Sequence, residues 1–252
     1  SLSRRDFGRI IEPLQKIGAN FKFNKKKGLP LMIMGSQFVN PIIYNENKGS
    51  AQCKSSVMLA SLNTPGETVI KAKKSRDHSE LLFKNLSIPI KVTKEKKYDL
   101  IKINGCKKIK PFNYRIPSDI SSSAFFIALT VLSKNSQLHI KNVNINPTRI
   151  GIIKILKKMG VKIFFKNIRV YKSEKIADIY VKSVKSLKSI NCPSDLNSSA
   201  IDEFLIIFLI AAKANGVSIF KKLSELNQKE SPRLKWGSKI LNMMGIKTKT
   251  TK

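Results

Sequence analysis

Residues suited to holding anions recur at the starts of predicted helices. Arg5, Arg149 and Arg233 each precede a glycine and an apolar helical face. An arginine guanidinium is planar and can bind a carboxylate or a phosphate through two parallel hydrogen bonds. Serine opens other predicted helices, the first at Ser50, and the free N–H groups of a helix start attract anions. These residues are compatible with chemistry on small anionic molecules.

The arginine-led helices belong to an internal repeat. Each has apolar residues three and four apart, which form one helix face, and then the pattern Leu-x-x-(Ile/Met)-Gly and a short strand. Gly18, Gly160 and Gly245 stand where a left-handed residue ends a helix. The strands expected after them contain Phe21 and Phe23, Ile163 and Phe165, and Ile246 and Thr248.

A second helix type recurs three times and is always opened by serine. Each of these helices continues with apolar residues, reaches a turn and is followed by a strand. The helix starts lie at residues 50–55, 120–125 and 198–203, and the strands at residues 68–71, 137–141 and 217–220. This alternation predicts an α/β (α+β) fold made of repeated βαβαββ units. Because one unit cannot bury both helices and its sheet, several units must pack together.

The composition is that of a globular protein with a large excess of positive charge. Hydrophobic residues make up 42% and charged residues 25%, and the net charge is +32. Such a charge fits nucleic acid, a membrane surface or small anionic substrates, but the lysines are spread along the whole chain. The longest apolar run, residues 204–212, is shorter than the roughly 20 residues of a membrane span. We therefore expect no membrane or nucleic-acid partner.

The three cysteines, Cys53, Cys106 and Cys192, are far apart in the sequence. An odd number at such spacing suggests neither a disulfide framework nor a zinc site. Reduced thiols, and hence a cytoplasmic location, fit this arrangement best.

The repeat pattern breaks near Pro117. Strand-like residues 98–103 and a polar stretch precede the break, and a new helix follows it. We place a domain boundary there, with residues 1–117 in a first lobe and residues 118–252 in a second. The two lobes are expected to be similar and to face each other across a cleft.

Seven motifs, in order along nearly the whole chain, resemble those of the 3-phosphoshikimate 1-carboxyvinyltransferase (EPSP synthase) family. They lie at residues 3–14, 49–55, 75–80, 116–122, 146–151, 200–204 and 229–234. The resemblance implies the two-lobed fold of enolpyruvyl transferases. It also implies transfer of the enolpyruvyl group of phosphoenolpyruvate to the 5-hydroxyl of shikimate 3-phosphate, in the shikimate pathway of aromatic amino acid biosynthesis. This chemistry uses a matched acid and base in a cationic cleft, with no metal or cofactor.

In the first lobe, the resemblance assigns binding roles to one arginine near the start and to two later motifs. Arg5 would hold the phosphoenolpyruvate anion, although a solvated arginine in a first helical turn is the alternative. The phosphate of shikimate 3-phosphate would be bound by Ser50, Ala51, Gln52, Ser75 and Arg76. Gln52 would also reach phosphoenolpyruvate. For Ser50, a simple N-cap is compatible with this role because one hydroxyl can serve both purposes.

In the second lobe, the resemblance assigns the catalytic groups. Asp202 would accept the proton of the 5-hydroxyl, Lys229 would orient that hydroxyl, Glu230 would protonate the methylene carbon, and Arg233 would pair with phosphoenolpyruvate. Asp202 has a structural alternative, because Ser199 and Asp202 also have the spacing of a capping box.

The sequence departs from the family pattern at Asp6, at Ser118, at the pair Asn227 and Gln228, and at Pro232. Ser3 and Asp6 still have capping-box spacing. Ser231 and Pro232 fit the N-cap and first position of a helix.

The resemblance also concerns length. Family members are longer and carry further cationic residues near both ends. We therefore expect this chain to be an internal fragment with little activity alone, and the full-length enzyme to be a monomer. Two alternatives remain, namely the related transferase that acts on UDP-N-acetylglucosamine and, from another class, a basic nucleic-acid-binding module, whose affinity would fall steeply with salt.

Overall fold

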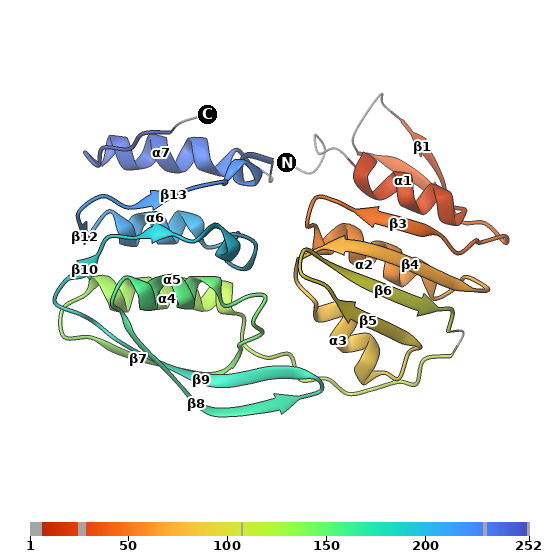
Figure 1. Ribbon diagram of the computed structural model, residues 1–252, viewed down its shortest axis with the longest axis horizontal. Helices are drawn as coiled ribbons and strands as arrows, with labels where there is room; N and C mark the ends of the chain where they lie inside the picture. Colours follow the sequence, from red (N-terminus) through yellow and green to blue (C-terminus); the bar gives the residue numbers. More distant parts are fainter. Residues whose placement is uncertain (1–6, 25–28, 107, 229–230, 251–252) are drawn as a thin grey trace. The chain divides into compact units, whose positions relative to one another are not determined.

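The computed structural model describes residues 7–24, 29–106, 108–228 and 231–250. The chain divides into two compact units, residues 1–114 and 115–252, and each is described by itself (Figure 1). The division falls a few residues before Pro117, where the sequence pattern breaks. Across the described ranges, no helix has both the length and the apolar character needed to cross a membrane.

The first unit is built around a four-stranded sheet with the strand order β3–β4–β6–β5. In that order the strands are Ile43–Glu46, Glu67–Lys73, Tyr98–Asn104 and Ile90–Lys94. Helix α2 (Ala51–Ser61) connects the parallel strands β3 and β4, and α3 (His78–Asn85) connects β4 to the antiparallel pair β5–β6. The chain order β3–α2–β4–α3–β5–β6 is the predicted βαβαββ unit.

Alternation along the strands gives the sheet of the first unit one buried face. Successive side chains of a strand point to opposite faces, and in β4 this buries Thr68, Ile70 and Ala72, while Lys71 and Lys73 are exposed. Helices α2 and α3 cover the buried face. The buried apolar cluster consists of Ile17, Val57, Met58, Ile70, Ala72, Phe83, Ile88, Ile101 and Ile103.

The first arginine-led repeat forms a helix followed by a hairpin. Helix α1 (Gly8–Ile17) is followed by the antiparallel strands β1 (Asn20–Phe23) and β2 (Leu31–Met34). Helix α1 ends at Gly18, whose φ is +127°. Gly160 and Gly245, the equivalent residues of the other two repeats, have φ of +92° and +79°. The predicted left-handed helix ends are therefore confirmed at all three glycines.

The second unit repeats the same arrangement with a shorter first strand. Helix α4 (Ile120–Leu132) leads to β7 (Gln137–Asn144), and α5 (Gly151–Lys158) leads to the hairpin of β8 (Lys162–Tyr171) and β9 (Glu174–Lys182). The sheet order is β7–β9–β8. Ser118 forms an isolated parallel bridge with Val143 of β7, so it occupies the place that β3 has in the first unit.

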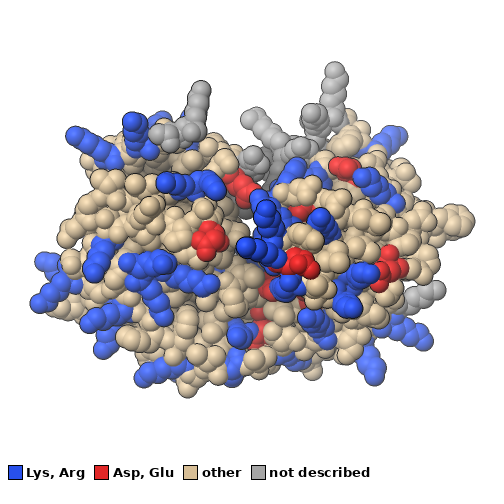
Figure 2. Space-filling model, in the orientation of Figure 1, with Lys and Arg blue, Asp and Glu red and all other residues tan. Residues whose placement is uncertain are grey.

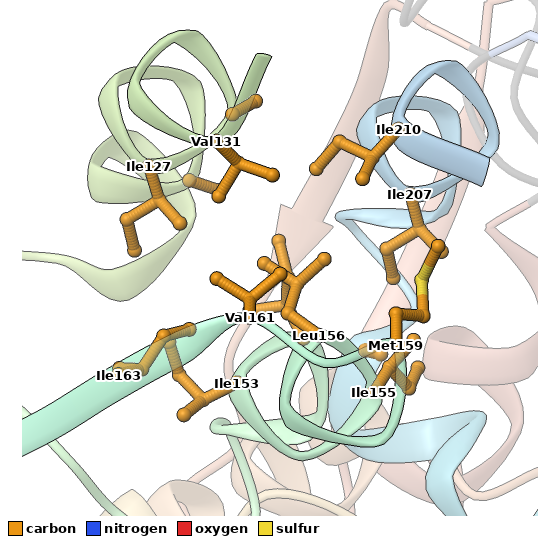
Figure 3. Close-up of a cluster of buried hydrophobic side chains, with 14 of the residues drawn as sticks. Ile127, Val131, Ile153, Ile155, Leu156, Met159, Val161, Ile163, Ile207 and Ile210 are labelled. Atoms are coloured by element: carbon orange, nitrogen blue, oxygen red, sulfur yellow. The ribbon is translucent and has the colours of Figure 1, made fainter. Parts of the chain in front are cut away.

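Three helices enclose the core of the second unit (Figure 3). Ile127 and Val131 of α4 meet residues of α5 and of α6 (Phe204–Ala211) in one buried cluster. Figure 3 labels Ile127, Val131, Ile153, Ile155, Leu156, Met159, Val161, Ile163, Ile207 and Ile210. The other side of α4 has large apolar residues in contact with solvent, with exposures of 66% for Phe125, 60% for Phe126 and 66% for Leu129.

The end of the second unit follows the βαβα part of the pattern. Short parallel pairs form between β10 and β12 and between β11 and β13. These strands are Leu187–Lys188, Ala214–Asn215, Asn191–Cys192 and Ile219–Phe220, and helix α7 is Arg233–Met243. The three 3₁₀ segments are η2 (Ser194–Leu196), η3 (Ser198–Ala200) and η4 (Ser224–Gln228).

Three local predictions were wrong. Serine does not open α4, because Asp119 is its N-cap and accepts a hydrogen bond from the N–H of Ser122. Ser198 and Ser199 lie in η3, and α6 starts later, at Phe204. Residues 246–250, the described residues after Gly245, form no strand; the N–H of Thr248 instead donates to Oδ1 of Asn242 in helix α7 at 2.9 Å.

Candidate functional site

The first unit presents the start of α2 as a candidate anion site. Ser50 is the N-cap, and its Oγ accepts a hydrogen bond from the N–H of Cys53 at 3.3 Å. Ala51 and Gln52 are the first two residues of the helix, so their N–H groups have no acceptor within the helix. The predicted N-cap role of Ser50 is confirmed. A helix start of this kind attracts phosphate through its free N–H groups and its dipole.

The loop that leads into α2 is held by a buried carboxylate. Glu46, with 2% of its surface exposed, accepts hydrogen bonds from the N–H groups of Lys48 at 3.0 Å and Gly49 at 2.8 Å. Gly49 has a φ of +70°, and a Cβ there would lie 3.4 Å from the carbonyl oxygen of Lys74. The α2 start therefore lies beside the segment that contains Ser75 and Arg76.

That segment contains a buried hydroxyl suited to a ligand. Ser75 and Arg76 connect β4 to α3, and Oγ of Ser75 has no hydrogen-bond partner among the described residues. A buried polar atom without a partner requires an explanation, and a bound oxyanion would supply one. The structure thus brings together, within one unit, the residues predicted to bind a phosphate, which are Ser50, Ala51, Gln52, Ser75 and Arg76.

Side chains of α2 contact both this segment and the start of α3. Nζ of Lys54 donates hydrogen bonds to the carbonyl oxygen of Arg76 at 2.7 Å and to Oε1 of Glu80 at 2.6 Å. The hydroxyls of Ser55 and Ser79 are 2.6 Å apart. Lys54 and Glu80 were not among the predicted site residues. A sequence signal existed, because helical spacing puts Lys54 on the same face as Val57, Met58 and Ser61, all of them buried.

The second unit contains an ion pair between two of the predicted site residues. Nη1 of Arg233, the first residue of α7, lies 3.2 Å from Oδ1 of Asp202, which precedes α6. About a quarter of each side chain is exposed, 24% for Arg233 and 29% for Asp202. The pair joins a carboxylate that can take up a proton to a guanidinium that can bind an anion. It is a suitable arrangement for proton transfer beside an anionic substrate.

The structural alternative for Asp202 is not realised. In a capping box, the Ser199 hydroxyl would accept a hydrogen bond from the N–H three residues later. Instead, Oγ of Ser199 donates to the carbonyl oxygen of Leu196 at 3.0 Å, within the 3₁₀ turns that precede α6. The Asp202 carboxylate pairs with Arg233.

The start of α7 is capped differently from the prediction. Pro232, rather than Ser231, is at the N-cap, and Arg233 is the first helical residue. Oδ1 of Asn227 accepts hydrogen bonds from the N–H groups of Leu234 at 3.1 Å and Lys235 at 3.2 Å. Asn227 thus satisfies N–H groups that an N-cap side chain usually serves. This departure from the family pattern has a structural function in holding the helix that carries Arg233.

A polar network lies next to Asp202 in the chain. Nη2 of Arg149 donates to Oδ1 of Asp119 at 2.9 Å and to Oγ of Ser121 at 2.6 Å. The Ser121 hydroxyl donates in turn to Glu203, which is buried with 1% exposed. Partial burial acts to raise the pKa of Asp119, but the hydrogen bond from Ser122 and the charge of Arg149 outweigh it and hold the pKa below its usual value. Sequence reasoning placed Arg149 and Ser121 at helix starts but did not predict this network.

Three predicted site residues, Arg5, Lys229 and Glu230, lie outside the described residues, as does the departure at Asp6. Ser118, the departure expected at the lobe boundary, is held to β7 through its backbone. Its N–H donates to the carbonyl oxygen of Asn142 at 2.9 Å, and its carbonyl oxygen accepts from Asn144 at 2.9 Å. Convergence of the two units' residues on one cleft stays a prediction.

Solved structures share this fold. The enolpyruvyl transferase NikO from Streptomyces tendae aligns with a TM-score of 0.61 at 14% identity, covering 85% of this chain and 51% of that chain. The fold is therefore the α/β fold of enolpyruvyl transferases. An EPSP synthase from Acinetobacter baumannii aligns over 100% of this chain and 56% of its own, with a TM-score of 0.83 and 38% identity.

The sequence comparisons identify one family within the enolpyruvyl transferases. The family model for EPSP synthase (3-phosphoshikimate 1-carboxyvinyltransferase) matches residues 1–252. A 3-phosphoshikimate 1-carboxyvinyltransferase from Ruthia magnifica is 43% identical over 98% of this chain and 56% of its own length, and one from Zymomonas mobilis is 39% identical over 98% and 54%. The chain belongs to the EPSP synthase family, as the motifs indicated. It spans about half the length of these relatives.

Proposed function

We propose that the full-length gene product transfers the enolpyruvyl group of phosphoenolpyruvate to the 5-hydroxyl of shikimate 3-phosphate and releases phosphate. The observation that supports this most is the family match across residues 1–252. It is strengthened by the curated relatives, which bear the name of that transferase. The relatives named here do not favour the alternative acceptor, UDP-N-acetylglucosamine.

The first unit would bind the phosphate of shikimate 3-phosphate. The free N–H groups at the start of α2 supply donors and a favourable dipole, and Oγ of Ser75 is a buried group without a partner in the described ranges. Arg76 adds a cation next to it. Gln52 would reach phosphoenolpyruvate, which Arg5 would also hold.

The second unit would supply the acid, the base and a further cation. Asp202 would accept the proton of the 5-hydroxyl, and the neighbouring Arg233, 3.2 Å away, would pair with phosphoenolpyruvate. Lys229 would orient the hydroxyl and Glu230 would protonate the methylene carbon. A positioned acid or base contributes about 10² to 10⁴ in rate.

The two steps balance without an added oxidant or cofactor. The hydroxyl oxygen bonds to the central carbon of phosphoenolpyruvate as its methylene group gains a proton. A proton then leaves the new methyl group, the double bond forms again, and the C–O bond to phosphate breaks. Asp202, as a carboxylate, would take the proton that the hydroxyl loses, and this proton leaves with phosphate. Glu230, as a carboxylic acid, would give the methylene group its proton and take one back from the methyl group.

The setting proposed for this enzyme is the cytoplasm, as a monomer that acts in aromatic amino acid biosynthesis without a metal or a nucleic-acid partner. Small anionic substrates are favoured over a nucleic acid because the lysines are spread along the whole chain, and Figure 2 shows lysines and arginines on the drawn face of each unit. A long polyanion needs a continuous basic track. Phosphorylated substrates need only a few cations close together.

The test is phosphate release by the full-length gene product, measured with phosphoenolpyruvate and each acceptor in turn. We expect turnover with shikimate 3-phosphate, and a fall in kcat of about 10² to 10⁴ in Asp202→Asn. Asp195→Asn is the matched control, because Asp195 is an exposed aspartate of the same unit. Turnover with UDP-N-acetylglucosamine alone, or an unchanged kcat in Asp202→Asn, would contradict the proposal.

A second measurement compares residues 1–252 with the full-length gene product in the same assay. We expect little or no turnover from residues 1–252, because each charge-assisted contact missing from a site costs about 1.5–3 kcal/mol. The exposed Phe125, Phe126 and Leu129 of α4 are also expected to lower its solubility. Equal turnover by the two proteins would show that residues 1–252 hold a sufficient site.

A further inference from the structure

The first unit contains a fully buried ion pair beside the candidate phosphate site. The side chains of Lys54 and Glu80 are 1% and 3% exposed, and Nζ lies 2.6 Å from Oε1. The same Nζ donates a hydrogen bond of 2.7 Å to the carbonyl oxygen of Arg76. We propose that Lys54 is a positioning residue, which holds the Ser75–Arg76 segment against α2 so that both can bind one phosphate group. This inference rests on the proposed function.

Lys54 is well placed for this role because of its position on α2. The first turn of α2 contains Ala51 and Gln52, and Lys54 follows directly after that turn. Its ammonium group therefore reaches the segment that faces the helix start. The Ser55–Ser79 hydroxyl contact of 2.6 Å links α2 to the first turn of α3, which follows the segment. One hydrogen bond thus ties α2 directly to the Ser75–Arg76 segment, and two further contacts tie α2 to the helix that follows that segment.

Stability alone does not explain the pair. Replacing a buried ion pair by apolar residues of similar volume is often neutral or stabilising, because two desolvated charges cost nearly as much as their attraction returns. An apolar pair cannot, however, donate a hydrogen bond to the carbonyl oxygen of Arg76. That bond is what the ammonium group adds, and it acts on the backbone between Ser75 and α3.

Glu80 has a separate role in this arrangement. Oε1 pairs with Lys54, while Oε2 is buried without a hydrogen-bond partner among the described residues. Glu80 therefore orients the ammonium group of Lys54, and it is Lys54 that contacts the segment itself. Glu80→Gln should retain an acceptor for Lys54, and so it should affect substrate binding less than the loss of the amine does.

The test uses the full-length gene product and the double variant Lys54→Met/Glu80→Leu, which removes both charges together. Two quantities are measured: hydrogen exchange of the backbone amides of residues 74–79 without substrate, and the Kd of shikimate 3-phosphate and of phosphoenolpyruvate. The matched control is Glu67→Leu/Lys102→Met, a pair from the same sheet with 41% and 42% of the side chains exposed. Glu80→Gln serves as the conservative variant.

We expect the double variant to fold with a similar Tm, and residues 74–79 to exchange about tenfold faster or more. The Kd of shikimate 3-phosphate should rise about tenfold to a hundredfold, more than that of phosphoenolpyruvate. Glu80→Gln should have nearly the wild-type exchange rate and Kd, and the control variant should change neither the exchange rate nor the Kd. If Lys54 and Glu80 had only a structural role, the double variant would have a lower Tm and would bind both substrates more weakly to the same degree.

Unchanged exchange at residues 74–79 would overturn the inference whether or not the enzyme is active. Faster exchange with an unchanged Kd for shikimate 3-phosphate would overturn the link to binding. If the wild type neither binds nor turns over shikimate 3-phosphate, the proposed function fails. The proposed link between Lys54 and binding of shikimate 3-phosphate then fails as well. Hydrogen exchange at residues 74–79 still decides whether Lys54 holds the Ser75–Arg76 segment in place.

Discussion

The two units support their candidate site residues in opposite ways. In the first unit, the Ser75–Arg76 segment is held by an ion pair whose side chains are 1% and 3% exposed. In the second, Arg149 bonds to Asp119, which has 48% of its side chain exposed, and to Ser121. The Arg149 side chain is itself only 15% exposed, so it is the carboxylate of Asp119 that has water nearby, whereas Lys54 and Glu80 are both buried.

This difference teaches where a single substitution should matter. A buried charge that loses its partner has no solvent to replace it, so the cost is large. A partly exposed charge can turn to water, so the cost is modest. The first unit should therefore respond to single changes far more strongly than the second does.

The largest effect is expected from Lys54→Met in the full-length gene product. The change leaves Glu80 buried and unpaired, which should lower the free energy of unfolding by about 3–5 kcal/mol. Urea denaturation measures this, with Lys16→Met as the control because the Lys16–Glu12 pair is exposed by 60% and 72%. A loss below about 1 kcal/mol would mean that the buried pair is no more important than a surface pair.

A smaller effect is expected from Arg149→Met. Asp119 can then be solvated, and Ser121 can still donate to Glu203, so the loss should be about 1–3 kcal/mol. The same denaturation experiment measures it. If Arg149→Met lowered the free energy of unfolding as much as Lys54→Met does, the two units would not differ. The Arg149 network would then behave like a fully buried ion pair.

The smallest effect concerns pH. Because the pKa of Asp119 is lowered in the folded protein, its contacts contribute stability above the ordinary aspartate value of 3.8. That contribution is lost as the pH falls through the lower folded value. As the pH falls below about 4, we expect the Tm of Asp119→Asn to decrease less than the Tm of the wild type. Parallel curves for the two proteins would argue against the role of this carboxylate.

Much of the fold could be predicted because it depends on local patterns. The spacing of apolar residues gave the helices, and the glycines at positions 18, 160 and 245 marked their ends, each with positive φ. The order β3–α2–β4–α3–β5–β6 followed from alternating helix types. Errors arose where a nearby side chain formed a hydrogen bond that the apolar pattern does not show. Asp119 replaced serine as the cap of α4, and Thr248 bonded to α7 instead of forming a strand.

The candidate site was predictable only as far as the motifs extend. Ser50, Gln52, Asp202 and Arg233 were found from the resemblance, and the structure places them at helix starts or beside them. The supporting contacts were missed because they join residues distant in sequence. Lys54 and Glu80 are separated by 26 positions, and no local pattern shows that two such charges meet.

The mutual dependence of the buried charges of Lys54 and Glu80 has an evolutionary consequence. A lineage that makes either residue apolar while the other stays charged passes through an intermediate with an unpaired buried charge, which selection should remove. The two positions are therefore expected to vary together among relatives, either both charged or both apolar. Such a double exchange would keep the fold but give up the hydrogen bond to the carbonyl oxygen of Arg76. Lineages that have made it should hold the Ser75–Arg76 segment by another contact.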